Sequence, residues 1–210
     1  QARNGKLTIS ATDLEIGIVV DIPAKIEEEG EVTIPAQTLT ELVSASPMDK
    51  ITLETTPLGL VLTGGKTKSV FQTTPAEEFP KLYGEKGDEV LVVRREQIDK
   101  DFSKIVFAAS PDTERPALSG VMIKEEKEGS LLVATDGYRL SLKKHAMEGK
   151  GKGKNETSVI VPSRVIRELV LMGKEVGSET VAVYVSAEKN QILFSEEDID
   201  QLEEVIYLTH

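Results

Sequence analysis

Short stretches in which apolar and polar residues alternate recur along the chain and predict β-strands. They include 121–124, 131–134, 180–185 and 192–194, all rich in Val, Ile or Leu. A period of two residues places alternate side chains on opposite faces, so one face of each strand can be buried. The segment 6–20 has the same character. The pattern therefore predicts a protein that is rich in sheet.

Three other stretches repeat apolar residues every three or four positions, which predicts helices with one buried face. Two of them begin after Pro35 and Pro162, and proline suits a first turn because its missing N–H would have no partner there. A further one covers 96–108. The predicted buried faces are Leu39, Leu42 and Val43 after Pro35, Ile98, Phe102, Ile105 and Val106 within 96–108, and Val165, Ile166, Leu169 and Val170 after Pro162.

The sequence contains an internal duplication. Residues 7–18 read LTISATDLEIGI and residues 131–142 read LLVATDGYRLSL, both built around Ala-Thr-Asp. Residues 32–43 read VTIPAQTLTELV and residues 159–170 read VIVPSRVIRELV, each a strand, a proline and a helix. Two unrelated motifs in the same order and at nearly the same offset indicate a repeated unit. Helices on one side of antiparallel sheets make an α+β fold.

Length and composition favour two domains. A chain of 210 residues is comfortable for two domains of about a hundred residues each. The stretch 73–89 is rich in proline, glycine and acids and has no periodicity, so it is the natural linker. We therefore place the first domain at 1–82 and the second at 83–210. Aromatic residues make up only 4% and Trp is absent, so Leu, Ile and Val must fill both cores.

Composition also restricts the compartment. There is no cysteine, which excludes disulfides, thiolate metal sites and cysteine nucleophiles and fits a reducing compartment, so we expect a cytoplasmic protein. No stretch approaches the roughly 18 apolar residues of a membrane span, and 1–9 lacks the apolar core of a signal peptide. We expect no membrane partner. The chain begins without Met beside a strand pattern, so we expect a cut N-terminus.

No motif supports catalysis, a metal or a cofactor. LTGGKTKS at 62–69 resembles a phosphate loop, but the first glycine of that motif would fall at Leu60, and both flanks alternate like strands, so we interpret it as a hairpin turn. Thr-Asp-Gly at 135–137 has the letters of an aspartic protease signature in the wrong order, and side chains that satisfy a tight turn explain it better. His145 and His210 have no partner at metal-ligand spacing.

The distribution of charge matters more than its sum. A formal net charge of -11 argues against binding a polyanion, because phosphate contacts draw on Lys and Arg. Two predicted helices nevertheless carry cations opposite their apolar faces, Lys100 and Lys104 on one and Arg164 and Arg167 on the other. This pattern leaves open a solvated face and a polyanion surface. The run EGKGKGKN at 148–155 is likewise a solvated loop or a phosphate-gripping segment.

Two stretches of the second predicted domain are distinctive, SPDTERPALSGVMI at 110–123 and VATDGYRLSL at 133–142. They resemble the middle domain of the bacterial DNA sliding clamp, the beta subunit of DNA polymerase III. SATDLEIGI at 10–18, TTPAEEFPKL at 73–82 and the two strand-proline-helix motifs support the match. The resemblance extends from about Lys6 to Phe194 and implies the DNA clamp fold, with antiparallel sheets outside and helices on the inner face.

The resemblance implies a non-catalytic accessory subunit of the DNA polymerase III holoenzyme, a processivity factor in DNA replication. Members are head-to-tail homodimer rings of three-domain subunits. Duplex DNA passes through the ring and is held by Lys and Arg without reading of its sequence. By this resemblance, the DNA-facing residues are Lys100, Lys104, Arg164 and Arg167.

The resemblance also implies a pocket that docks short linear peptides of DNA polymerase, clamp loader and repair proteins. Leu118 and Leu140 would form its apolar socket, and the backbone at Gly137 would let a peptide approach closely. The matching positions are Leu118, Thr135, Gly137, Tyr138, Arg139 and Leu140, with Arg115 near the rim.

The chain also departs from the family. The first domain lacks the opening strand and helix, the third domain is absent, and the tail after Phe194 diverges, so we expect a chain truncated at both ends that cannot close a ring alone. The helix after Pro35 carries no basic residue, which puts its contact with DNA in question. The alternative function is a standalone peptide-binding module that has lost DNA encirclement, and an enzyme is the third and least favoured class.

Overall fold

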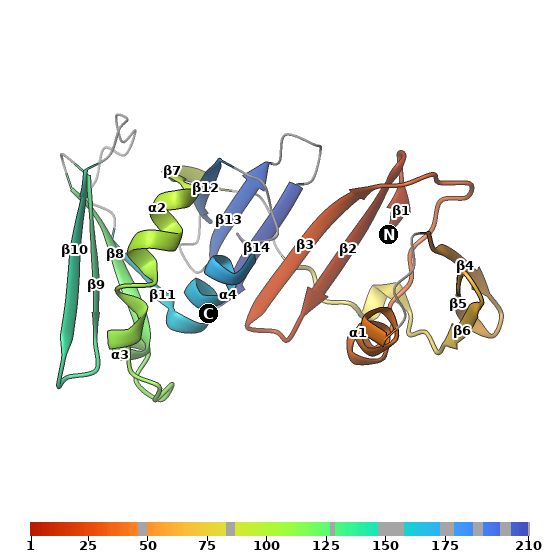
Figure 1. Ribbon diagram of the computed structural model, residues 1–210, viewed down its shortest axis with the longest axis horizontal. Coiled ribbons are helices and arrows are strands. Elements are labelled where there is room, and N and C mark those ends of the chain that lie inside the picture. The colour runs from red at the N-terminus through yellow and green to blue at the C-terminus, as the bar shows by residue number, and fades with distance from the viewer. Residues whose placement is uncertain are drawn as a thin grey trace. The chain divides into compact units, whose positions relative to one another are not determined.

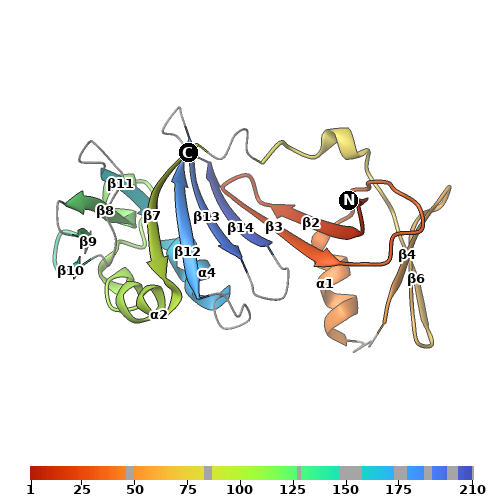
Figure 2. The same ribbon diagram turned by 90° about the horizontal axis from the view of Figure 1, so that it is seen from above.

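The structure, a computed structural model, falls into two compact units. Unit 1 comprises Gln1–Ala11 and Ile22–Lys81, and unit 2 comprises Thr12–Asp21 and Leu82–His210. Figures 1 and 2 show the elements of both. The structure describes residues 1–45, 50–82, 87–126, 129–146, 158–172, 179–186, 191–197 and 203–209.

Unit 1 combines a hairpin, one helix and a small sheet. β1 (Ala2–Arg3) pairs antiparallel with β2 (Lys6–Thr12), and the helix α1 (Ala36–Ala45) starts directly after Pro35, as predicted. A 3-10 turn, η1 (Ala76–Glu78), lies near the end of the unit. The three-stranded sheet has the order β4 (Thr52–Thr56), β5 (Gly59–Gly64) and β6 (Thr67–Phe71).

The core of unit 1 lies between α1 and this sheet. Leu60, Leu62 and Phe71 are buried, and Leu39 and Leu42 of α1 pack against them. Val43, which was predicted on the same face of the helix, is 48% exposed, so that part of the prediction is wrong. The narrow sheet covers only the Leu39 and Leu42 side of the apolar stripe.

The glycine-rich segment at 62–69 is the hairpin turn between β5 and β6. The two strands pair in continuous register up to Gly64 and Thr67. Gly65 has a positive φ of 57°, a conformation that glycine adopts without steric cost. The turn connects two strands and does not open a helix, so the hairpin interpretation is confirmed.

Unit 2 contains two antiparallel sheets. The first has the order β10-β9-β8-β11 and the second includes the run β3-β14-β13-β12-β7. The stretches 121–124, 131–134, 180–185 and 192–194 all lie within strands, so these four predictions are confirmed. The bounds are β8 (Gly120–Glu126), β9 (Gly129–Thr135), β10 (Leu140–Ala146), β11 (Ser158–Pro162), β3 (Ile16–Pro23), β14 (Glu203–Thr209), β13 (Gln191–Glu197), β12 (Thr180–Val185) and β7 (Asp88–Arg94).

The helices of unit 2 pack on these sheets. α4 (Ser163–Met172) follows Pro162, and a short helix, α3 (Pro116–Ser119), precedes β8. The segment predicted as one helix over 96–108 is divided into α2 (Arg95–Gln97), the π-helical turn η2 (Ile98–Phe102) and the 3-10 turn η3 (Val106–Ala108). Figure 1 shows this segment beside α4, in front of β7, β12 and β13, and the two pack together.

The core of unit 2 confirms the buried faces but not the regular helix. Ile98, Phe102, Ile105 and Val106 are buried, as the periodicity predicts. A single regular helix over 96–108 is wrong, because the wider π-helical turn also brings Asp101 inside, with its carboxylate 3.4 Å from the ammonium of Lys143 on β10. In α4 the predicted residues Val165, Ile166 and Leu169 are buried in the same cluster, and Val170 packs against it.

Candidate functional site

The turn between β9 and β10 is held by two side chains. The Thr135 hydroxyl accepts a hydrogen bond from the N–H of Gly137 (3.1 Å) and donates to the carbonyl of Arg139 (2.7 Å). Asp136 Oδ1 accepts from the N–H groups of Tyr138 (3.0 Å) and Arg139 (2.9 Å). These bonds satisfy the backbone of the turn, so the structural interpretation of Thr-Asp-Gly is supported.

The turn between β2 and β3 repeats the same bonds in the first copy of the duplication. The Thr12 hydroxyl accepts from the N–H of Leu14 (2.9 Å) and donates to the carbonyl of Ile16 (2.8 Å). Asp13 Oδ1 accepts from the N–H groups of Glu15 (3.0 Å) and Ile16 (2.9 Å). The duplication seen in the sequence is therefore a duplication of structure, and it divides the segment 6–20 into two strands.

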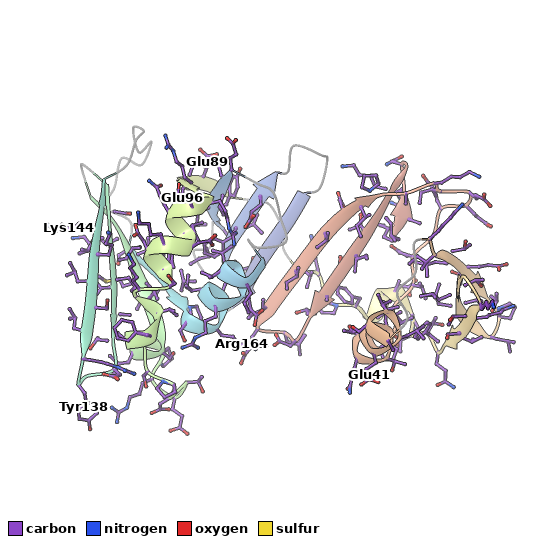
Figure 3. All side chains as sticks on the ribbon, in the orientation of Figure 1. Glu41, Glu89, Glu96, Tyr138, Lys144 and Arg164 are labelled. Carbon is purple, nitrogen blue, oxygen red and sulfur yellow. The ribbon has the colours of Figure 1, made fainter. Side chains whose placement is uncertain are left out.

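The turn between β9 and β10 exposes an apolar surface. Tyr138 at its tip is fully exposed, and Leu140 and Leu142 on β10 are 64% and 52% exposed. Figure 3 shows Tyr138 projecting from the end of the hairpin. Gly137 is also exposed, with nothing within 4 Å of a Cβ added there, whereas Thr135 is half-buried.

The short helix α3 lies against β8 and β9 near this turn. Leu118 is half-buried there, and its carbonyl accepts from the N–H of Ser110 (2.8 Å) while its own N–H donates to Arg115 (2.9 Å). The Arg115 side chain is 71% exposed, 3.9 Å from the carboxylate of Asp112. The structure thus places the predicted pocket residues on one hairpin and one adjacent helix, and the pocket itself stays a prediction.

Arg139 is held on two sides. Its Nε donates to Asp136 Oδ2 (2.9 Å), and its guanidinium carbon lies 5.6 Å from the centre of the Phe107 ring. The N–H groups of Arg139 and Tyr138, and then the Arg139 side chain, lower the pKa of Asp136, so this carboxylate stays ionised. The guanidinium is therefore fixed while 55% of the Arg139 side chain remains exposed.

Lys100, Lys104 and Arg167 lie on exposed positions of unit 2. Lys100 belongs to η2, Lys104 follows it, and Arg167 is on α4. Within the described part of the chain, the guanidinium of Arg167 donates only a long hydrogen bond, 3.4 Å, to the hydroxyl of Ser163. These three cations lie on the two helical segments that pack side by side (Figure 1).

Arg164 has a different environment from the other three predicted DNA-facing cations. Its guanidinium lies 2.5 Å from Asp13 Oδ2 and 3.2 Å from Glu15 Oε2, both in the first Thr-Asp turn. Chiefly the N–H of Ile16, and also Arg164, lower the pKa of Asp13, while Asp13 raises that of Arg164. The charge of Arg164 is thus compensated locally by two carboxylates.

Family comparison decides which protein class carries this arrangement. The DNA polymerase III beta subunit N-terminal domain matches residues 1–83, and the central domain of that subunit matches residues 92–206. The chain belongs to the DNA polymerase III beta subunit family. The central-domain match continues beyond Phe194, and β14 there pairs with β13 and β3.

Beta sliding clamps are the named relatives of this chain. The clamp of Synechococcus elongatus is 33% identical over 181 residues, which are 85% of this chain and 48% of that protein. The clamp of Synechocystis is 29% identical over 205 residues, 90% of this chain and 52% of that protein. The chain therefore spans about half the length of the curated relatives it matches.

Solved clamp structures share the fold. The beta chain of DNA polymerase III from Streptococcus pneumoniae has a TM-score of 0.83 and 26% identity, covering 99% of this chain and 54% of that one. The beta subunit of Thermotoga maritima has a TM-score of 0.81 at 24% identity, over 99% of this chain and 54% of that one, which shows the fold. The α+β clamp fold predicted from the sequence is confirmed.

Sequence reasoning missed two contacts at this clamp-family site. Phe107, beside Arg139, is an aromatic residue outside the apolar stripe of 96–108 and is 55% exposed, and that position was a usable signal. The Arg164 to Asp13 contact joins residues far apart in sequence and gave no local signal. The run at 148–155 and His210 lie outside the described residues.

Among the described residues, no group of three or more His, Cys, Asp and Glu side chains is placed to hold a metal ion. In the same part of the chain, no helix is long and apolar enough to cross a membrane.

Proposed function

We propose that this chain is the part of a cytoplasmic sliding clamp that holds duplex DNA and docks partner proteins, without catalysing a reaction. The observation that carries the DNA function is the set of exposed cations Lys100, Lys104 and Arg167 on two helical segments packed side by side. Cations on helix surfaces contact phosphates without reading bases, so they suit a protein that must slide. We also propose that the boundary between the two clamp domains lies near residue 82.

The DNA contact is assigned to unit 2 and not to α1. Along its polar side α1 presents Gln37, Thr40 and Glu41, and the amide of Gln37 donates to the carboxylate of Glu41 (2.9 Å). The helix contains no Lys or Arg. Because phosphate binding depends on cations, α1 offers little attraction to DNA.

An NMR titration tests this assignment. A short duplex added to the isotopically labelled chain at low salt should shift the backbone amides around Lys100, Lys104 and Arg167 and leave those of α1 unchanged. The variant Lys144→Gln is a control that should leave these shifts unchanged. Lys143 and Ser141 on β10 contact Asp101 in η2 and the carbonyl of Lys104. Lys144 is exposed on the opposite face of the same strand (Figure 3). Shifts confined to other surfaces, or none at all, would rule out this DNA surface.

The docking of partner peptides is supported by a second observation. Tyr138 and Leu140 are large apolar side chains held in solvent by a turn whose backbone bonds are satisfied. Burial of such surface under a peptide would contribute roughly 25 cal/mol per Å². Leu118 supplies the floor and Arg139 and Arg115 the polar rim in this proposal. The partners are DNA polymerase, clamp loader and repair proteins, as the family resemblance implies.

Peptide titration separates a full clamp from a standalone peptide-binding module. A clamp-binding peptide should shift the amides of Leu118 and Arg139, and Tyr138→Ala with Leu140→Ala should weaken its binding at least tenfold. A chain that binds this peptide but no duplex would favour the module. A chain whose Leu118 and Arg139 signals do not move would lack the proposed pocket.

Ring formation from clamp domains is supported by one edge of β10, which has no partner strand among the described residues. This strand is the last in its sheet. The equivalent strand of the first copy, β3, pairs with β14 through Ile16 to Val20. By the duplication, this edge of β10 is the place where a β14-like strand of a further clamp domain would join, so successive domains of a ring would connect by continued sheets.

A further inference from the structure

Arg95, the first residue of α2, is a charged residue inside the core of unit 2. The residue is 5% exposed. One guanidinium nitrogen donates to the carboxylate of Glu196 on β13, and the other donates to the carbonyl of Leu169 on α4. Its Nε lies 3.4 Å from Asp99 Oδ1 in the next turn of the same helical segment. A single side chain therefore joins three elements.

Net stability alone does not account for this arrangement. Glu196 is 2% exposed, so both charges of the pair have been removed from water. A buried ion pair often contributes little, and well-packed apolar residues of similar volume commonly serve as well or better. What a planar guanidinium adds is direction, because its donors fix the angle and position of the groups that accept from them.

The elements joined by Arg95 are those that carry the exposed cations. Arg95 leads directly into η2, which contains Lys100 and is followed by Lys104, and Leu169 lies two residues after Arg167 on α4. The π-helical turn departs from regular helix geometry, so the backbone after Arg95 does not by itself give Lys100 the direction of a straight α-helix. An apolar contact alone would still permit the α2–η2 segment to shift along α4.

We propose that Arg95 is a positioning residue that fixes the register of the α2–η2 segment against α4, so that Lys100, Lys104 and Arg167 form one cationic surface. The use of this surface for DNA rests on the proposed function. The register of the α2–η2 segment against α4 does not depend on the proposed function.

Distance measurement by electron spin resonance tests the register without DNA. The chain has no native cysteine, so labels at Lys104→Cys and Arg167→Cys report one distance. The unchanged background should give a single narrow distribution. Arg95→Met with Glu196→Leu removes both buried charges together and should broaden or shift the distribution by several ångströms, while circular dichroism and cooperative melting are retained.

A matched control removes a different partly buried ion pair. Lys143→Met with Asp101→Asn separates β10 from η2 and leaves α4 untouched, so the labelled distance should stay narrow. If the Arg95 and Glu196 double variant does not fold, Arg95→Lys replaces it, since one ammonium cannot reach both Glu196 and Leu169 with the same geometry. A narrow, unshifted distribution in the folded Arg95 variant would overturn the proposal.

Duplex affinity then tests the use of the register. In unlabelled protein at low salt, the Arg95 and Glu196 double variant should bind a short duplex at least threefold more weakly than the parent, although every surface cation is retained. A changed distance with unchanged affinity would refute the role of Arg95 in presenting DNA contacts. A changed distance in a parent chain that binds no duplex would uphold the register and refute the proposed DNA function.

Discussion

At the scale of residues, the two Thr-Asp turns are the same hydrogen-bonded device with one difference. Gly137 has a φ of 91° in the second turn, and Leu14 has a φ of 77° at the equivalent point of the first. A side chain at positive φ brings its Cβ close to the backbone, whereas glycine avoids this strain. The first turn therefore carries a backbone cost that the second does not.

Exchange of these two residues should change stability in opposite directions. Leu14 is 72% exposed, so Leu14→Gly loses little packing and should raise the free energy of unfolding by about 1 kcal/mol. Gly137→Ala has open space around its new Cβ but should lower the free energy of unfolding by about 1 kcal/mol through backbone strain alone. Urea unfolding of both variants measures this, and a destabilised Leu14→Gly protein would contradict it.

Asp13 should make stability depend on pH. The N–H of Ile16 foremost, with the Arg164 side chain and the N–H of Glu15, lowers the pKa of Asp13 in the folded chain. Its stabilisation is therefore fully present above the unfolded pKa of about 3.9 and is lost as pH falls through the lower folded pKa. The difference in melting temperature between wild type and Asp13→Asn should be largest near neutral pH and should become small in acid. A difference that is constant with pH would refute this.

At the scale of elements, local pattern predicts a great deal. The four strand predictions in unit 2 and the buried residues of 96–108 and α4 follow from periods of two and of three to four residues. The π-helical turn does not, because it accommodates Asp101 opposite Lys143, a partner on a distant strand. The contact of Arg164 with Asp13 was missed for the same reason. Long-range charge pairs leave no periodic trace in a sequence.

Because Arg164 is paired with carboxylates, we expect the two arginines of α4 to contribute unequally to duplex affinity. Arg164 already contacts Asp13 and Glu15, whereas the polar partner of the Arg167 side chain among the described residues is the Ser163 hydroxyl alone. Arg167→Gln should therefore reduce duplex affinity more than Arg164→Gln does. Arg164→Gln should instead lower the free energy of unfolding slightly, within the roughly 0.2–1 kcal/mol usual for exposed ion pairs. Fluorescence anisotropy and urea unfolding measure the two effects. Equal losses of affinity would show that Arg164 leaves its carboxylates to bind phosphate.

At the scale of the whole molecule, the proposed cationic surface belongs to an acidic protein. The net charge is -11, yet Lys100, Lys104 and Arg167 are exposed on or beside the helical segments of unit 2. Local charge governs contact with DNA, while the overall negative charge disfavours attachment elsewhere on the surface.

The family matches cover both units, and the chain spans about half the length of its relatives. The candidate site residues could be named from the resemblance, whereas the compensation of Arg164 by Asp13 and Glu15 required the structure.

The salt dependence of duplex binding tests the central claim most directly. Affinity is measured by fluorescence anisotropy over a series of salt concentrations, for two duplexes of unrelated sequence, with wild type and with Lys100, Lys104 and Arg167 all changed to Gln. Wild type should bind both duplexes equally. The slope of log affinity against log salt is negative, and its magnitude should be smaller by about 3 in the triple variant, since each phosphate contact adds roughly 0.9. Equal slopes for the two proteins, or a strong preference for one duplex, would contradict the account.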